Sequence, residues 1–229
     1  MATPLARLEA APDLVDQVYT SLLDAISEGS LAPGQRITQE EIAQQLAVSR
    51  QPVLQALLLL KKDGFVLDAP GRGLLVAPLD AEGVLHVYQV RVALDSLAVR
   101  LASLRRIKLD PALIVNGRKA AAGRNVKAMI DTDIAFHDAI YAASGNPTIA
   151  QTAQQQWRHL RRVMGAVVRL SNRRAAIWDE HEEIARAISA GDADRAARLI
   201  EQHGRRASEN LAEQLAVLMQ DKSTQGAKR

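Results

Sequence analysis

The sequence predicts a mainly α-helical protein: an N-terminal winged helix-turn-helix followed by an all-α antiparallel helical bundle. Three observations predict this fold class. Aromatic residues are only 3% of the 229-residue chain, and the helix-favouring residues Ala, Leu, Glu, Gln and Arg are abundant. Short β-like runs surround a single Pro-Gly-Arg-Gly turn at 70–73. From Asp80 onward, apolar residues recur only at helical spacing.

The first helix is expected from Asp13 to about Gly29, because apolar residues recur every three or four positions. Thr38 and Glu41 form a T-x-x-E capping box, which begins a short second helix. Ser49 is the expected cap of a third helix that ends at Gly64. Two β-like runs around the turn at 70–73 then predict a hairpin. This order of elements is typical of a winged helix-turn-helix.

Six helices are expected in the C-terminal part, with a final frayed stretch. They are placed at about Ala81–Leu104, from Asp110, at about Asn125–Ser144, Thr148–Leu170 and Arg174–Ala190, and from Asp192 to about Gln220. The predicted organisation is a tail (1–12), a DNA-binding domain (13–79), a helical domain (80–221) and a second tail (222–229).

Composition excludes several classes of protein. The chain has no cysteine, which excludes disulfides and thiolate metal sites and fits a reducing cytoplasm. No apolar run reaches the roughly 18 residues that span a bilayer, and the N-terminus shows no signal peptide. Residues 1–79 hold six Lys and Arg against nine Asp and Glu, a net charge of −3. Bulk charge therefore gives no support to DNA binding, and the case depends on local arrangement.

The segment from Ile26 to Val66, "ISEGSLAPGQRITQEEIAQQLAVSRQPVLQALLLLKKDGFV", resembles the DNA-binding half of GntR-family regulators. The most specific part is "VSRQPV". The resemblance implies that residues at the start of the third helix meet base edges and phosphates, and that the hairpin tip reaches a phosphate or the minor groove. The candidate DNA-binding residues are Arg36, Thr38, Ser49, Arg50, Gln51 and Arg72.

The third helix departs from this family where phosphate contacts are expected. Leu54 stands where the family has Arg, and Leu58 lies one turn further on the same face. Each lost phosphate contact lowers the affinity and its salt dependence. Leu54 can instead touch a thymine methyl group. The alternative is that this helix packs against protein, and that the domain is a relic or an interaction module.

Four polar residues in the helical domain suggest a metal site. Asp133 and His137 are four residues apart, hence on one helical face. His181 lies ten residues before Gly191 and His203 twelve residues after it. With a tight turn at Gly191, a rise of about 1.5 Å per residue places these two at similar heights on antiparallel helices. The alternative is that Asp133 and His137 are an ordinary helical pair and the other histidines are satisfied core residues.

The same residues, with "FH" and "ASGNP", resemble the FCD domain of FadR-type GntR regulators, and six helices resemble its VanR-like subgroup. The resemblance implies that Asp133, His137, His181 and His203 bind a divalent metal, with Zn²⁺, Ni²⁺ and Mn²⁺ all suited to nitrogen and oxygen ligands. Arg91 lies on an apolar stripe, so it is expected to point inward and meet either an effector carboxylate or Asp95. Asn146 is a second effector candidate, with a turn role as the alternative.

These features predict a ligand-responsive transcription factor without catalytic residues. A small organic acid would bind near the metal and, as is usual in this family, release a near-palindromic DNA operator read by a homodimer; such a protein is a repressor. A metalloenzyme is the alternative, because a helical Asp/His₃ site can activate water. However, Ala185 prevents an H-E-x-x-H motif around His181. A sensor with an impaired DNA-binding domain is the third interpretation.

Overall fold

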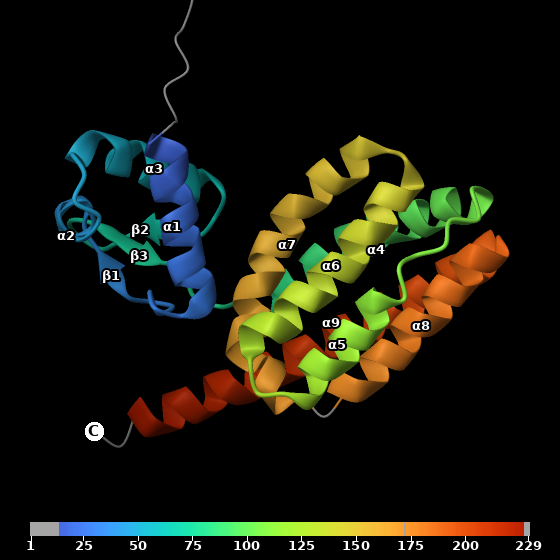
Figure 1. The fold of residues 1–229 in the computed structure, drawn as a ribbon. Helices are drawn as coiled ribbons and strands as arrows, with labels where there is room; N and C mark the ends of the chain where they lie inside the picture. The colour runs from blue at the N-terminus through green and yellow to red at the C-terminus, as the bar shows by residue number, and fades with distance from the viewer. Residues whose placement is uncertain (1–13, 172, 227–229) are drawn as a thin grey trace, which may run out of the picture. The chain divides into compact units, whose positions relative to one another are not determined.

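The computed structural model describes residues 14–171 and 173–226 (Figure 1). The chain divides after Pro78 into two compact units. The first contains three helices and a small sheet, and the second is entirely helical, which confirms the predicted mainly α fold class. The predicted tail 1–12 lies outside the described residues.

The N-terminal unit contains the predicted helices and hairpin. Helices α1 (Leu14–Glu28), α2 (Gln39–Gln45) and α3 (Arg50–Lys62) pack with strands β1 (Arg36–Ile37), β2 (Val66–Asp68) and β3 (Leu74–Val76). The antiparallel sheet has the order β1-β3-β2, with Leu75 opposite Arg36 on one side and Leu67 on the other. Strand β1 was not predicted, because two residues are too few to show the alternation of a strand.

Local signals in the sequence explain where these elements begin. The capping box predicted for α2 is present: the Thr38 side chain accepts from Glu41 N–H, and the Glu41 carboxylate accepts from Thr38 N–H. Apolar side chains of α1 and α3 form the core with the sheet, and its fully buried members include Val53, Leu60 and Phe65. This core fixes α3 so that its opposite face remains exposed.

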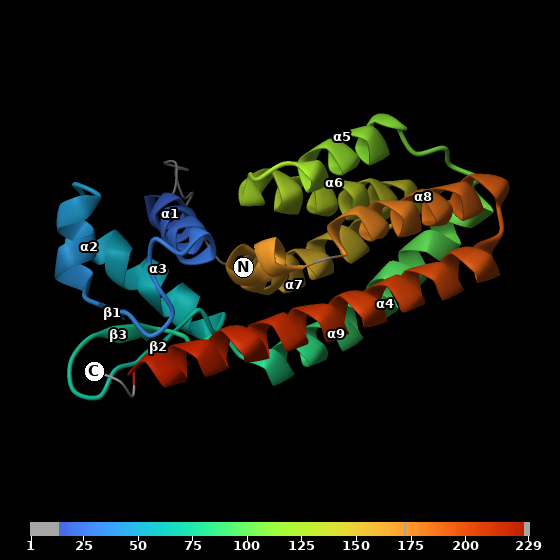
Figure 2. The same cartoon turned by 90° about the horizontal axis from the view of Figure 1, so that it is seen from below.

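The C-terminal unit is a bundle of six α-helices within the described residues. These are α4 (Ala81–Leu104), α5 (Ala112–Ala122), α6 (Val126–Ser144), α7 (Pro147–Val167), α8 (Arg174–Ala190) and α9 (Ala193–Gly226). Helices α4 and α9 lie side by side, and α8 runs back along α9 (Figure 2). The described helices include none that is both long and apolar enough to cross a membrane.

Three predicted helix boundaries, both ends of α7 and the end of α9, differ from the structure. Helix α7 begins at Pro147 because the Asn146 side chain caps it, accepting from Thr148 N–H at 3.1 Å. It ends at Val167 and is followed by a 3₁₀ turn, Val168–Leu170, that was predicted as α-helix; such turns are common at helix ends. Helix α9 continues to Gly226, beyond the predicted end near Gln220.

Two glycines allow the helices around the site to approach closely. A Cβ at Gly204 on α9 would overlap the side chain of Val92 on α4, and a Cβ at Gly117 on α5 would overlap the ring of Trp178 on α8. A third glycine, Gly191, ends α8 with φ +78°, a conformation that glycine adopts without strain. The tight α8–α9 turn predicted at this residue is therefore present.

Candidate metal centre and nucleic-acid interface

Three histidines converge in the core of the C-terminal unit. His137 comes from α6, His181 from α8 and His203 from α9, and their exposed fractions are 0%, 0% and 3%. One ring nitrogen of each lies within 4.8 Å of those of the others. The Nε2 atoms of His181 and His203 are 3.3 Å apart. The predicted convergence of three separate helices is thus present.

Asp133 adds a carboxylate to this cluster from one turn earlier on α6. Its Oδ1 lies 3.6 Å from Nε2 of His181, and its side chain is 14% exposed. Nε2 of His181 faces both this carboxylate and Nε2 of His203. Three imidazoles beside one carboxylate, without sulfur, are a donor set that fits a divalent cation.

Two of the buried imidazoles, those of His137 and His181, are held in the neutral form that binds metals. Burial lowers the pKa of His137, and the Arg91 guanidinium lowers it further against the opposing effect of Asp95. Burial, together with His203, His137 and Arg91, holds the pKa of His181 well below its usual value. Neutral imidazole is the ligand form of histidine. Neither His137 nor His181 therefore has to lose a proton to bind a metal near neutral pH.

Glu180 orients His203, and it was not predicted. Its Oε2 lies 2.9 Å from Nδ1 of His203, while Arg173 and Arg206 bind its Oε1 at 2.5 and 3.0 Å. Burial raises the pKa of Glu180, but His203, Arg206 and Arg173 outweigh it and the pKa is lowered. A carboxylate on one histidine nitrogen aims the other at a metal, here toward His181.

Arg91 lies within the core, with an exposed fraction of 1%. Its Nε is 3.3 Å from Oδ2 of Asp95, its Nη2 is 2.8 Å from Nε2 of His137, and its guanidinium lies 3.8 Å from the centre of the Trp157 ring. Of the two partners left open by the sequence, Asp95 is the one in contact. An effector contact by Arg91 remains a prediction.

Tyr141 adds a third group to the buried Arg91–Asp95 pair: its hydroxyl donates to Oδ1 of Asp95 at 2.5 Å. Burial raises the pKa of Asp95, but Arg91, His137 and Tyr141 outweigh it and lower the pKa to about 2. Asp95 is therefore a charged carboxylate whose compensation depends first on Arg91.

A small cavity of about 50 Å³ lies beside Asp133 and His203. Its polar lining also includes Tyr88, Ser171, Arg174 and Asn210. Neither Arg91 nor Asn146 is among the lining residues; Asn146 serves instead as the cap of α7, and its effector role stays a prediction. Arg174 was missed because an arginine at a helix start carries no signal that separates a site residue from a surface one.

The start of α3 exposes the three residues predicted to meet DNA. Ser49, Arg50 and Gln51 are all exposed, and the Ser49 side chain makes no capping hydrogen bond. Arg50 forms an ion pair of 2.5 Å with Glu40, whose side chain is 71% exposed. Exposed pairs contribute about 0–1 kcal/mol, so Arg50 can exchange this partner for a phosphate or a base.

The hairpin tip presents Arg72 between Gly71 and Gly73, both with positive φ. The Arg36 guanidinium donates to the backbone oxygens of Pro70 and Arg72. Arg36 thus braces the hairpin, and the Thr38 hydroxyl is engaged in the capping box. These two candidate DNA contacts have structural partners within the unit, whereas Arg72 is exposed.

The leucine run of α3 is divided between two faces. Leu57 and Leu60 are buried, at 4% and 0% exposed, whereas Leu54 and Leu58 are 41% and 57% exposed. The exposed pair lies on the same face, one helical turn apart. The exposed face of α3 is therefore partly apolar in its middle, between Gln51 and the exposed Lys61 and Lys62. The loss of a phosphate contact at Leu54 stays a prediction.

Comparisons with known proteins cover both units. The profile described as "Bacterial regulatory proteins, gntR family" matches residues 14–76, and that described as "FCD domain" matches residues 86–206. An uncharacterized HTH-type transcriptional regulator in an unstable DNA locus of Streptomyces ambofaciens is 29% identical over 185 residues, 76% of this chain and 75% of that protein. YdhC of Bacillus subtilis, also an uncharacterized HTH-type transcriptional regulator, is 36% identical over 85 residues, 37% of this chain and 38% of that protein.

Several curated relatives are matched over only 38% to 66% of their own length. Among solved structures, McbR/YncC of Escherichia coli has a TM-score of 0.74 at 22% identity, covering 89% of this chain and 99% of that one. A putative GntR regulator from Rhodococcus has a TM-score of 0.71 at 23% identity, covering 86% and 96%. These two solved structures therefore share the fold of this chain.

Proposed function

Because the chain belongs to the GntR family of bacterial regulatory proteins, in its FadR-type branch with an FCD domain, we propose that a small carboxylate bound near a metal controls its DNA binding. The main observation in support of this proposal is the convergence of three buried imidazoles, with Asp133 beside them. The matched relatives are regulators, which favours sensing over catalysis. Membership in the VanR-like subgroup stays a prediction.

The metal would be held by Asp133, His137, His181 and His203. Three imidazoles and one carboxylate, without sulfur, suit Zn²⁺, Ni²⁺ or Mn²⁺. When bound, the ion supplies positive charge that attracts an anionic ligand. Glu180 keeps the His203 ring oriented, so the protein fixes the ligand geometry through its own hydrogen bonds.

The effector would enter the cavity that Asp133 and His203 share with Arg174. We assign Arg174 to the carboxylate, because guanidinium groups bind carboxylates through two parallel hydrogen bonds. Tyr88 and Asn210 supply further polar atoms in the same lining. A cavity of about 50 Å³ restricts the effector to an acid of few heavy atoms, such as acetate or lactate.

Small carboxylates are expected to weaken DNA binding through this cavity. The test is fluorescence anisotropy of a DNA fragment selected from genomic DNA by the zinc-loaded protein, titrated with and without acetate or lactate. The expected result is at least about a tenfold loss of affinity, within the usual range of about 5–150-fold for coupled sites. Arg174→Ala is expected to abolish the response, while Arg198→Ala, a change on the exposed side of α9, preserves it. An equal response in Arg174→Ala would remove the assigned role.

The chain would bind DNA as a homodimer, and the DNA-binding unit of each copy would contact one half-site of a near-palindromic operator. Ser49, Arg50, Gln51 and Arg72 are the proposed contacts, and Arg36 and Thr38 shape the surface. Effector binding would favour one arrangement of the two DNA-binding units because its affinity differs between arrangements.

Restoring an arginine at position 54 is expected to steepen the salt dependence of DNA binding. Leu54→Arg places a cation on the exposed face of α3, and one added phosphate contact changes the slope of log K against log salt by about one unit. Gln17→Arg adds the same charge on the exposed side of α1 and serves as the matched control. If both variants shift the slope equally, α3 does not lie against phosphates through this face.

A further inference from the structure

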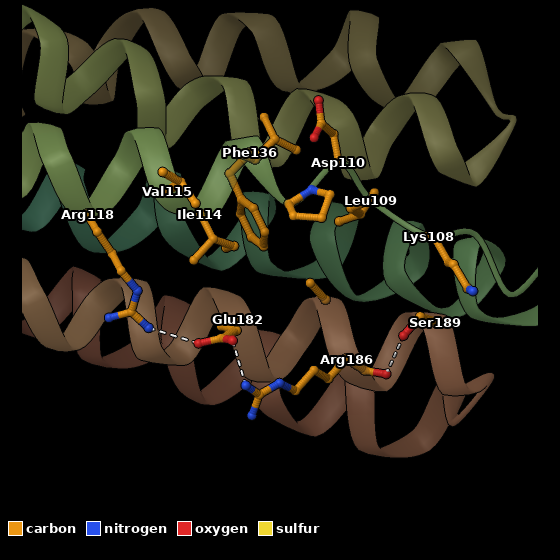
Figure 3. A pocket seen from close by; sticks show the side chains of 13 residues that line it. Lys108, Leu109, Asp110, Ile114, Val115, Arg118, Phe136, Glu182, Arg186 and Ser189 are labelled. Atoms are coloured by element: carbon orange, nitrogen blue, oxygen red, sulfur yellow. Dashed lines mark hydrogen bonds and ion pairs between the residues drawn. The ribbon is translucent and has the colours of Figure 1, made fainter.

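A second cavity of about 520 Å³ lies between α5, α8 and the segment that leads into α5 (Figure 3). It shares no lining residue with the small cavity beside His203. Its walls are largely apolar, with Leu109, Ile114, Phe136 and Ala185 among the lining side chains. A concave apolar site of this size with a few polar groups is typical of small-molecule binding.

The charged groups of the lining leave one cation available. Arg118 and Arg186 both bind the Glu182 carboxylate, at 2.9 and 2.5 Å, and Arg118 also binds Asp179 at 2.6 Å. The Asp110 carboxylate accepts from an N–H at the start of α5 at 2.8 Å. Lys108 makes no ion pair with any residue in the described part of the chain. The lining therefore offers an apolar surface and three cations, Lys108, Arg118 and Arg186, against the two carboxylates of Asp110 and Glu182, a net charge of +1.

We propose that this cavity is a second ligand site for an amphipathic monocarboxylate, separate from the histidine cluster. The apolar body would lie against Leu109 and Ile114, and the carboxylate would pair with Lys108. A neutral ligand would leave Lys108 unused, and a dicarboxylate would place its second charge against apolar walls, where burial without a partner is costly. The site fits one negative charge on a body of about six to ten carbons.

The Phe136 ring joins this cavity to the histidine cluster. It lines the cavity and stacks on the His181 ring, with centroids 4.1 Å apart and an interplanar angle of 18°. It also contacts Trp178 edge-on, with centroids 6.3 Å apart. Phe136 therefore separates the cavity from His181 and contacts Trp178, whose fluorescence can report changes at this wall.

The test is isothermal titration calorimetry of octanoate into the full chain freed of metal by a chelator, with tryptophan fluorescence as a second readout. We expect saturable binding of one octanoate per chain. Octylammonium has the same chain and the opposite charge, and acetate has the charge without the chain. Both are expected to bind at least about tenfold more weakly, because each loses one of the two contributions. Equal binding of octylammonium, or no saturable binding of octanoate, would overturn the proposal.

Single substitutions test whether octanoate binds in this cavity. Lys108→Glu is expected to weaken octanoate about tenfold or more, because attraction becomes repulsion. Lys119→Glu makes the same charge change at an exposed α5 position outside the lining and is expected to have no effect. Ala185→Phe, checked for folding by circular dichroism, should fill the cavity and block binding. Asp133→Ala should leave binding intact; its loss there, or unchanged binding in Lys108→Glu, would place octanoate elsewhere and refute the proposal.

Discussion

Replacement of Arg91 by methionine is expected to lower the free energy of unfolding by about 3–5 kcal/mol, the usual cost of removing one partner of a buried ion pair. Asp95 is 2% exposed, and its pKa of about 2 shows how strongly its surroundings favour the charged form. Without Arg91, this buried carboxylate retains, among the described residues, Tyr141 and the more distant His137. Urea denaturation of the metal-free chain measures the loss.

The double variant Arg91→Met/Asp95→Leu separates charge compensation from packing. Replacing both members of a buried pair by apolar residues is often close to neutral, so it should recover much of the stability lost in Arg91→Met. Arg100→Met is the matched control, because Arg100 pairs with Asp194 at the surface at 2.6 Å. That change should cost less than about 1 kcal/mol. If Arg91→Met and Arg100→Met lower the free energy of unfolding equally, the buried pair contributes no more to stability than the surface pair.

Zinc is expected to stabilise the folded chain by about 4 kcal/mol when free zinc reaches a thousand times its dissociation constant. The physical reason is that the cluster forms only when α6, α8 and α9 are packed, so the ion binds the folded state in preference to the unfolded one. Denaturation with and without zinc measures the gain, and elemental analysis should give one ion per chain.

His203→Ala is expected to remove most of this stabilisation, because it deletes a ligand and the ring that Glu180 orients. His86→Ala is the matched control: the His86 side chain is 65% exposed and lies on α4 outside the cluster. If zinc stabilises His203→Ala as strongly as the parent chain, the ion binds elsewhere and the proposed sensing site loses its basis.

Much of the fold and the centre of the site could be predicted from local patterns. Asp133 and His137 share a face because helical periodicity requires it. His181 and His203 meet because a glycine-terminated turn brings two helices back upon each other, and their distances from Gly191 are similar. These inferences need only helix geometry and one turn, which is why the convergence was predictable.

The surroundings of the cluster could not be predicted in the same way. Arg174 and Asn210 line a cavity only because α8 and α9 have a particular rotation and height relative to Tyr88 on α4. The large cavity depends on the path of residues 105–111 before α5, which carries no periodic signal. The partner of Arg91 was open because the sequence placed both Asp95 and a ligand within reach. Such questions are decided by packing between helices rather than by spacing within one.

The contact between Arg91 and His137 has a consequence for how metal occupancy is communicated. A neutral imidazole has one nitrogen lone pair available, and the guanidinium lies 2.8 Å from Nε2 of His137. If that lone pair accepts from Arg91, an ion that takes it must turn the guanidinium away. Arg91 is also bound to Asp95 and stacked on Trp157, so its displacement would disturb α4 and α7 together. Metal binding would then replace the Arg91 guanidinium at His137 with the metal ion. The displaced Arg91 would no longer connect α4 to α7.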